Sequence, residues 1–158
     1  MDDVAIARAL HVASVVLWIG GVGFVTTALL PALRLKAPDQ RMELFDRIER
    51  RFAWQARIST AVAGLTGLHM LYRLDLWDRF RHAAYWWMDA MVAVWLLFTL
   101  MLFVGEPLIL HRWLLRRSQV EPETTFRLVQ RLHWILLLIS LITVLGAVAG
   151  SHGLLLFG

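Results

Sequence analysis

Residues 9–33 read ALHVASVVLWIGGVGFVTTALLPAL, a run of 25 residues without a formally charged side chain. A membrane-spanning helix needs about 20 consecutive, mostly apolar residues. The run therefore predicts a membrane-spanning helix close to the N-terminus. It contains one ionisable residue, His11, and Trp18 follows seven residues later. Because seven residues make about two helical turns, both side chains are expected on nearly the same helix face.

Three more apolar stretches follow, at about 58–74, 85–110 and 132–157, and the mean hydropathy of the chain is +0.61. The predicted fold class is all-α, an integral membrane four-helix bundle that forms one domain, 1–158. Its helices are expected over about 5–33, 56–74, 83–111 and 127–157.

The segment between the first two helices reads RMELFDRIERRFAWQAR (41–57). Four apolar residues recur at helical spacing and share one face, whereas arginines and acidic residues fill the other; they are Leu44, Phe45, Ile48 and Phe52. The pattern predicts an amphipathic helix over about 41–54 that lies on the cytoplasmic membrane surface.

The distribution of positive charge predicts the orientation of the helices. Because the helices alternate in direction, segments 34–57 and 111–131 lie on one side, and they hold twelve of the sixteen Lys and Arg residues. By the positive-inside rule this side is cytoplasmic in a bacterial inner membrane, and both termini are periplasmic. The N-terminal MDDVAIAR lacks the positive charge and cleavage site of a secretory signal, so the first helix is expected to be retained.

Several classes of site are excluded by composition and by missing motifs. The chain has no cysteine, which excludes disulfides, iron–sulfur clusters and covalent haem attachment. It contains no G-x-G-x-x-G, P-loop, G-x-S-x-G or H-E-x-x-H motif. Basic residues are not interleaved with an exposed aromatic platform, so no nucleic-acid partner is expected.

Three histidines are predicted near one level of the outer membrane half. His11 and His69 each lie about five residues inside the outer end of a helix, roughly 8 Å deep. His152, in GSHG, lies near that level. Neutral imidazole binds iron, copper or zinc, and ionisable groups inside a membrane are candidate functional groups. These positions predict a metal site formed by His11 with His69 or, otherwise, His152.

Two histidines are predicted at the inner ends of the third and fourth helices. They are His111 and His133, and a second metal site between them is left open. The alternative is that both face lipid phosphates beside the neighbouring arginines. His82 is expected to be a solvated residue of the outer loop.

Two carboxylates in the third apolar stretch require partners, because buried carboxylates are costly. Asp89, near the outer end, is expected to meet Arg8 or to orient a metal-binding histidine. Glu106, near the inner end, is expected to pair with Arg57 at the start of the second helix, and a role in proton transfer is the alternative.

Small residues recur at four-residue spacing in two of the predicted helices. Gly146 and Gly150 form a GxxxG pair, and Ala63 and Gly67 have the same spacing. Such pairs let helices approach closely within a membrane. They also leave space beside a flat ligand.

Leu10-His11, Trp18 and the run Glu49-Arg50-Arg51 together resemble the HemJ-type protoporphyrinogen oxidases. More loosely, the chain resembles the copper-resistance protein D (CopD)-like membrane proteins. The resemblance implies a four-helix membrane fold in which His11 binds b-type haem. That family has a histidine–alanine–lysine sequence entering the third helix, where this chain reads MDAM with Asp89 and Ala90. The implied property is therefore haem binding, and the substrate is left open.

The resulting hypothesis is a b-type membrane cytochrome with one haem, or two if the inner histidines bind a second. Its expected role is electron transfer or oxidation of a quinol or porphyrinogen-like substrate. The lipid bilayer and a quinone or redox protein are the expected partners, and a homo-oligomer is left open. One alternative is a copper-binding or copper-transport protein that also uses Met70, Met88 and Met91. Another is a structural subunit of a respiratory assembly.

Overall fold

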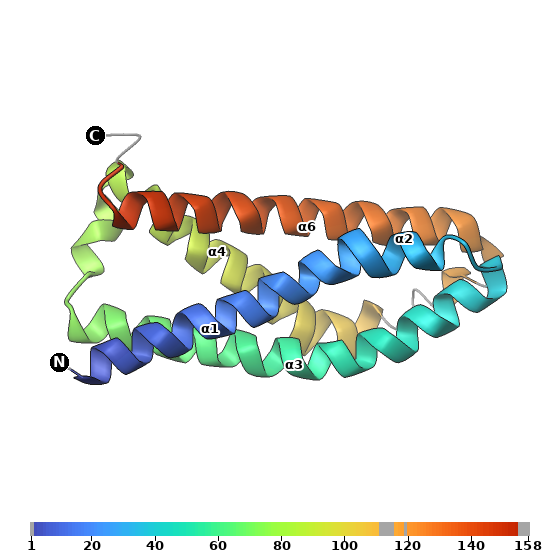
Figure 1. Ribbon diagram of the computed structural model, residues 1–158, viewed down its shortest axis with the longest axis horizontal. Helices are drawn as coiled ribbons and strands as arrows, with labels where there is room; N and C mark the ends of the chain where they lie inside the picture. The colour runs from blue at the N-terminus through green and yellow to red at the C-terminus, as the bar shows by residue number, and fades with distance from the viewer. Residues whose placement is uncertain (1, 111–115, 119, 155–158) are drawn as a thin grey trace.

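The computed structural model describes residues 2–110, 116–118 and 120–154. In this part of the chain the structure is helical and contains no strand. The long helices α1, α3, α4 and α6 run alongside one another and alternate in direction, as Figure 1 shows. The all-α class predicted from the sequence is confirmed.

The first long stretch is α1 (Asp2–Phe24), continued by a π-helical turn, η1 (Val25–Leu29), and by α2 (Leu30–Leu33). Pro31 lies in the first turn of α2. Proline has no N–H and its ring crowds the carbonyl one turn earlier. The wider π-helical turn just before Pro31 accommodates both effects. The helical run ends at Leu33, as predicted.

The second stretch differs from the prediction, because α3 (Pro38–Arg73) is one uninterrupted helix of 36 residues. It includes both the expected surface helix, 41–54, and the expected second helix, 56–74. Residues 39–63 contain neither glycine nor proline, and the junction AWQA consists of residues compatible with a helix. Nothing in the sequence therefore separates the two parts.

The N-terminal part of α3 packs on the protein itself. Phe45 is 1% exposed and lies in a core cluster with Leu30 and Phe126. Arg41 pairs with Glu123 at the start of α6, with 2.6 Å between the guanidinium nitrogen and the carboxylate oxygen. Phe45 and Phe52 of the predicted amphipathic face thus pack on the protein core beside α2 and α6, whereas Leu44 is exposed. This corrects the expectation of a separate surface helix.

The third stretch begins with two 3₁₀ turns, η2 (Trp77–Arg81) and η3 (Ala83–Tyr85). It continues as α4 (Trp86–Leu100) and ends in a π-helical segment, η4 (Met101–Leu110). η4 contains Pro107, just as Pro31 follows η1. Both π-helical segments are therefore associated with a proline.

The fourth stretch, α6 (Pro122–Ser151), starts five residues before the predicted boundary. Pro122 occupies the first turn, where a missing N–H costs nothing, and Glu121 precedes the helix. The described helix ends at Ser151, whereas the prediction extended it to residue 157.

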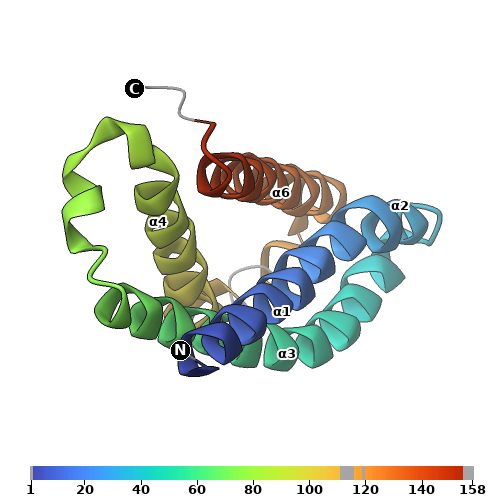
Figure 2. The same ribbon diagram turned by 60° about the vertical axis from the view of Figure 1, so that its left-hand side comes forward.

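Two pairs of helices can be distinguished. α1 packs closely against α3, and α4 packs against α6 (Figure 2). Near the N-terminus α1 lies beside α3, and its continuation through α2 reaches α6 at the other end (Figure 1). The central core cluster joins both pairs through Trp18, Phe98 and Leu137.

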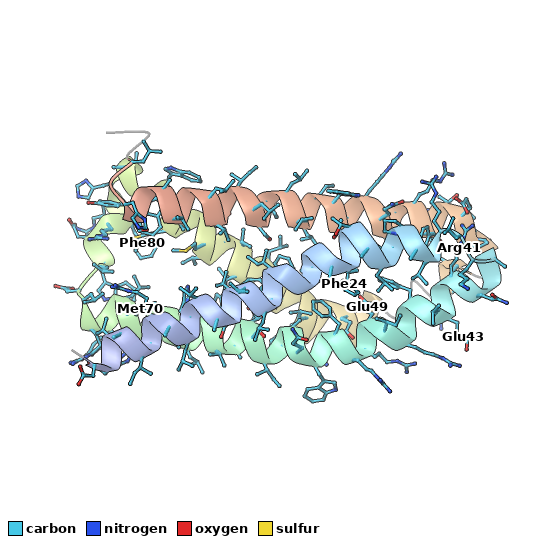
Figure 3. All side chains as sticks on the ribbon, viewed as in Figure 1. Phe24, Arg41, Glu43, Glu49, Met70 and Phe80 are labelled. Atoms are coloured by element: carbon cyan, nitrogen blue, oxygen red, sulfur yellow. The ribbon has the colours of Figure 1, made fainter. Side chains whose placement is uncertain are left out.

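The start of α1, the end of α6 and the 74–85 connection lie at one end of the molecule, and the starts of α3 and α6 lie at the other (Figure 1). Figure 3 shows Met70 and Phe80 at the first end and Arg41 and Glu43 at the second. The alternation on which the charge analysis rests is thus present in the structure.

Three helical stretches have the length and apolar composition of membrane spans: Asp2–Leu33, Ala83–Glu106 and Pro122–Ser151. Their outward faces are apolar, with Val16 64%, Leu100 61% and Leu145 68% exposed. Such surfaces are suited to contact with lipid.

Candidate functional site

His11 lies on the face of α1 that packs against α3. Its Nδ1 is 2.9 Å from the carbonyl oxygen of Ala63 and 3.2 Å from the hydroxyl oxygen of Thr66. A carbonyl oxygen can only accept, so Nδ1 carries the proton and donates it. The neutral ring then has an unprotonated Nε2, the form in which an imidazole binds a metal. The contact fixes both the orientation of the ring and its tautomer.

His69 lies near the C-terminal end of α3 and faces the start of α1. Its Nε2 is 3.5 Å from a carboxylate oxygen of Asp3, which also accepts a 2.7 Å hydrogen bond from Arg73. All three side chains are roughly half exposed. His11 contacts Ala63 and Thr66 of α3 directly, whereas His69 is directed to Asp3. The structure does not bring His11 and His69 together as opposed ligands.

His152 caps the end of α6, and its Nδ1 donates to the carbonyl of Val148 at 2.8 Å. The side chain is exposed. The end of α6 lies away from the start of α1 in Figures 1 and 2. His152 therefore does not approach His11 in this arrangement. His82 is also exposed, in the connection before α4, and contacts Asp78 at 3.2 Å, in agreement with the predicted loop position.

His133 lies in the N-terminal half of α6, half-buried against α3. Its Nδ1 donates to the carbonyl of Val129 at 2.9 Å, and its ring packs edge-on against Phe45, with centroids 5.8 Å apart. His111, its predicted companion, lies outside the described residues. In the described part of the chain no group of three or more His, Cys, Asp or Glu side chains could hold a metal ion.

Aromatic rings fill the gaps that glycines, which have no side chain, leave on neighbouring helices. We call each such gap a glycine notch. A Cβ added at these glycines would approach or clash with the facing ring. The pairs are Gly21 with Phe52, Gly64 with Trp95, Gly67 with His11, Gly146 with Trp86 and Gly150 with Trp87. The GxxxG pair of α6 thus receives two indole rings of α4. The space predicted for close backbone packing or for a flat ligand is occupied by side chains of the protein.

Trp18 is 3% exposed and packs edge-on against Phe98, with ring centroids 4.9 Å apart. It lies on the same face of α1 as His11, as its spacing predicts. Between them lies Ser14, also buried. This face of α1 thus directs a histidine, a hydroxyl and an indole into the interior.

Arg57 and Glu106 form the ion pair predicted from the sequence, with 2.6 Å between Nη2 and Oε2. The Nε of Arg57 donates to the carbonyl of Leu102 at 3.0 Å. In the π-helical register the donor to this carbonyl would be residue 107, a proline without an N–H. Arg57 therefore supplies the hydrogen bond that Pro107 cannot. The pair links α3 to η4, with side chains 22% and 20% exposed.

Asp89 lies exposed in the first turn of α4, where the positive end of the helix dipole favours a carboxylate. Among the described residues it forms no hydrogen bond or ion pair with Arg8 or with a histidine. Arg8 is likewise exposed. The expected role in orienting a metal ligand has no counterpart in these contacts.

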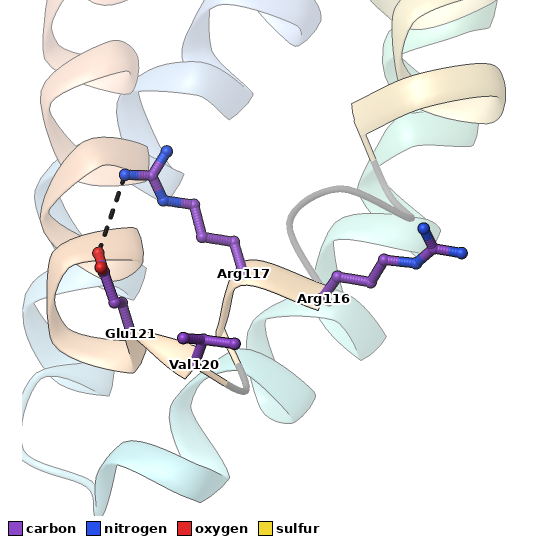
Figure 4. A pocket seen from close by; sticks show the side chains of 4 residues that line it. All are labelled: Arg116, Arg117, Val120 and Glu121. Atoms are coloured by element: carbon purple, nitrogen blue, oxygen red, sulfur yellow. Dashed lines mark ion pairs between the residues drawn. The ribbon is translucent and has the colours of Figure 1, made fainter.

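An open pocket lies beside the start of α6 (Figure 4). It is lined by Arg116, Arg117, Val120 and Glu121, and contains no predicted site residue. Arg117 and Glu121 approach within 3.9 Å with both side chains substantially exposed. A solvated pair of this kind contributes at most about 1 kcal/mol. The pocket is a feature of the surface and separate from the histidines.

Polar groups of the α1, α3 and α4 interior were not predicted as site residues. Trp95 donates from Nε1 to the carbonyl of Thr60 at 2.9 Å, and the hydroxyls of Thr60 and Thr99 are buried. Threonine is common in membrane helices, so its presence alone gives no signal. The spacing of Trp95 and Thr99, one helical turn apart, was the available indication that both face one neighbour.

Comparison of the chain with family models, with curated proteins and with solved structures finds no match.

Proposed function

We propose that the chain is a four-span protein of the bacterial inner membrane, with α3 providing the fourth span. The support is the C-terminal half of α3, which exposes Ile58, Leu65 and Leu68 beside the three apolar stretches. The twelve positive residues of 34–57 and 111–131 then face the cytoplasm and both termini face the periplasm. A reporter enzyme active only outside the cytoplasm and fused after Gly158 is expected to be active. Activity of a cytoplasmic reporter at that position would contradict this topology.

Within this fold we propose that the protein binds b-type haem through His11. The single observation that carries the proposal is the contact of Nδ1 with the carbonyl of Ala63, which leaves Nε2 available to iron. The resemblance of Leu10-His11 and Trp18 to the HemJ-type proteins supports the same assignment. The donor chemistry of His11 therefore fits haem.

Pairing of His11 with His69 or His152 is not included in this proposal, because His69 contacts Asp3 and His152 contacts the carbonyl of Val148. His11 is proposed as the one histidine ligand from the outer half, and a second site involving His111 and His133 stays open. When bound, haem would supply one-electron redox chemistry. The chain would position the iron and exclude water from it. The proposed role is electron transfer or oxidation of a membrane-soluble quinol or porphyrinogen-like substrate.

The test is the visible spectrum of the protein purified in detergent. A sharp Soret band, with α and β bands after dithionite reduction, is expected for the wild type. His11→Ala should lose the haem, whereas His82→Ala, which alters an exposed loop histidine, should keep it. Full haem content in the His11→Ala variant would refute the assignment.

The same preparation tests the alternative from the copper-resistance proteins. Met88 is 4% exposed and lies near the outer end of α4, where a thioether would suit copper. A colourless protein that retains copper by elemental analysis would replace the haem proposal with this one. A protein with neither haem nor copper would favour the structural subunit.

A further inference from the structure

Three buried polar atoms in the middle of the molecule have no hydrogen-bond partner among the described residues. They are the indole nitrogen of Trp18, the hydroxyl of Thr60 and the hydroxyl of Thr99. Trp18 is 3% exposed and Thr60 is fully buried. A buried polar group without a partner costs about 1–3 kcal/mol. Three such atoms therefore require a physical explanation.

Other hydroxyls in the helices show that a buried hydroxyl need not lack a hydrogen-bond partner. Six of them donate to the carbonyl four residues earlier on their own helix, at 2.6–2.8 Å: Thr26, Thr27, Thr66, Thr125, Ser140 and Thr143. Thr60 and Thr99 have the same option, because residues 56 and 95 precede them within a helix. Their hydroxyls do not form this bond. They are directed instead into the packed interior.

The register between α3 and α4 places the two hydroxyls at the same level. Trp95 contacts Thr60 on one side of this level, and Arg57 contacts Leu102 on the other. In antiparallel helices Thr60, three residues after Arg57, lies opposite Thr99, three residues before Leu102. The two residues therefore lie at the same level of the α3–α4 interface.

Trp18 brings its indole to this level from α1. It belongs to one core cluster with Ala56 and Phe98. Ala56 is one helical turn from Thr60, and Phe98 precedes Thr99 in the chain. Gln55 also reaches the carbonyl of Leu17, the neighbour of Trp18, at 3.4 Å. The three unpartnered atoms thus belong to three helices that pack together around this core cluster.

The chemistry of this region identifies its ligand. Trp18 offers one donor, and each threonine hydroxyl offers a donor and two acceptors. The surroundings are apolar, with Val94, Phe98 and Leu137 in the same cluster, so a bare ion would lack compensating charge. A water molecule both donates and accepts, and buried waters typically form about three hydrogen bonds. We propose that Trp18, Thr60 and Thr99 together bind ordered water within the membrane interior.

The water site lies between two polar groups already described. Thr66, which contacts His11, is six residues from Thr60, or about 9 Å along α3. Arg57, which pairs with Glu106, is three residues from Thr60 in the other direction, or about 4.5 Å. Along α3, the proposed water would thus lie between the level of His11 and that of the Arg57–Glu106 pair. This proposal does not depend on haem binding.

Water at this site is detected by NMR of protein labelled with ¹⁵N in its tryptophan indoles. The Trp18 indole proton, assigned by its loss in Trp18→Phe, is expected to show a cross-peak to water. The matched control is Trp95, whose indole donates to Thr60 and should show none. Absence of a cross-peak at Trp18 in the folded wild-type protein overturns the proposal.

Variants provide a second readout that does not require NMR. Thr60→Val and Thr99→Val are expected to lower the Tm in detergent, because each removes a hydrogen bond to water while keeping the side-chain shape. If the region is dry, removing an unpartnered hydroxyl raises the Tm instead, and that result overturns the proposal. Thr143→Val is the control at a hydroxyl bonded within its own helix. Where a variant does not fold, the wild-type cross-peak alone decides.

Discussion

The α1–α3 and α4–α6 interfaces are packed in the same way but differ in their hydrogen bonds between helices. In both, aromatic rings fill glycine notches: Phe52 of α3 lies against Gly21 of α1, and Trp87 of α4 lies against Gly150 of α6. Trp95 of α4 fills a notch of the same kind at Gly64 of α3. The α1–α3–α4 side adds hydrogen bonds between helices, from His11 to Ala63 and from Trp95 to Thr60. Between α4 and α6 no hydrogen bond is found in the described part of the chain. Among the described residues, side-chain packing alone joins α4 to α6, whereas α1, α3 and α4 are joined by packing and by hydrogen bonds.

This difference bears on the proposed site. In lipid, a polar contact between helices typically adds little stability, often under about 1 kcal/mol. Ionisable and polar groups in such interiors are candidate functional groups. His11, the proposed haem ligand, lies on the side that carries the hydrogen bonds between helices.

The largest effect is expected from Arg57→Ala, on the polar side. The change leaves the Glu106 carboxylate and the Leu102 carbonyl without their partner, and breaking a buried pair typically costs 3–5 kcal/mol, so we expect about 3 kcal/mol for this partly exposed pair. The free energy of unfolding in detergent, followed by circular dichroism, measures the loss. Arg57→Ala combined with Glu106→Gln should recover part of it. A loss below about 1 kcal/mol would show that the pair is effectively solvated.

The next effect tests whether both sides depend on ring-in-notch packing. Gly150→Ala would push a methyl group into the Trp87 indole, and Gly64→Ala would do the same at Trp95. Overpacking of this kind costs about 1–3 kcal/mol. Thermal unfolding should show a similar loss for both variants. Gly20→Ala is the control, since nothing lies within 4 Å of its added Cβ. If both variants were as stable as the wild type, ring packing against glycine would not contribute to the stability of either side.

A third comparison isolates the hydrogen bond that distinguishes the two sides. Trp95→Phe and Trp87→Phe remove equal ring volume from a glycine notch, but only Trp95 donates to a carbonyl, whereas the Trp87 indole nitrogen is buried without a partner. Trp95→Phe should therefore cost about 1 kcal/mol more than Trp87→Phe. The difference between the two unfolding free energies is the measurement. Equal losses would mean that the indole bond contributes nothing.

The smallest effect is expected outside both interfaces. Arg47 and Glu43 form an exposed pair one turn apart on α3, at 2.7 Å. Such pairs contribute about 0.3–0.5 kcal/mol, so Arg47→Ala should change the unfolding free energy by no more than that. The same denaturation experiment checks it and sets the baseline for Arg57→Ala. A loss comparable to that of Arg57→Ala would mean that geometry, and not burial, determines the larger effect.

The sequence predicted the features that depend on position along a helix. Apolar runs gave the helical class, and charge counting placed the arginine-rich segments at one end. Arg57 and Glu106 were paired because both lie at the inner ends of adjacent helices. The continuity of α3 could also have been inferred, since no glycine or proline interrupts residues 39–63.

Features that depend on helix rotation could not be predicted. His11 and His69 were placed at one depth, but depth does not tell which neighbour a ring faces. In the structure His69 contacts the carboxylate of Asp3, and His11 donates a hydrogen bond to the carbonyl of Ala63. Likewise, a GxxxG pair does not tell whether a backbone or a ring will fill it. At Gly146 and Gly150 the bulky indoles of adjacent α4 residues take the space.

The unbroken course of α3 has a mechanical consequence. A helix of 36 residues is about 54 Å long, and even a tilt of about 40° leaves roughly 41 Å along the membrane normal, more than the hydrocarbon thickness of about 30 Å. In the proposed four-span topology, α3 would therefore project beyond the bilayer at its arginine-rich end. Force applied to that projecting end, by bilayer thinning or by a bound protein, would reach Arg57 and Thr60 through a single continuous helix.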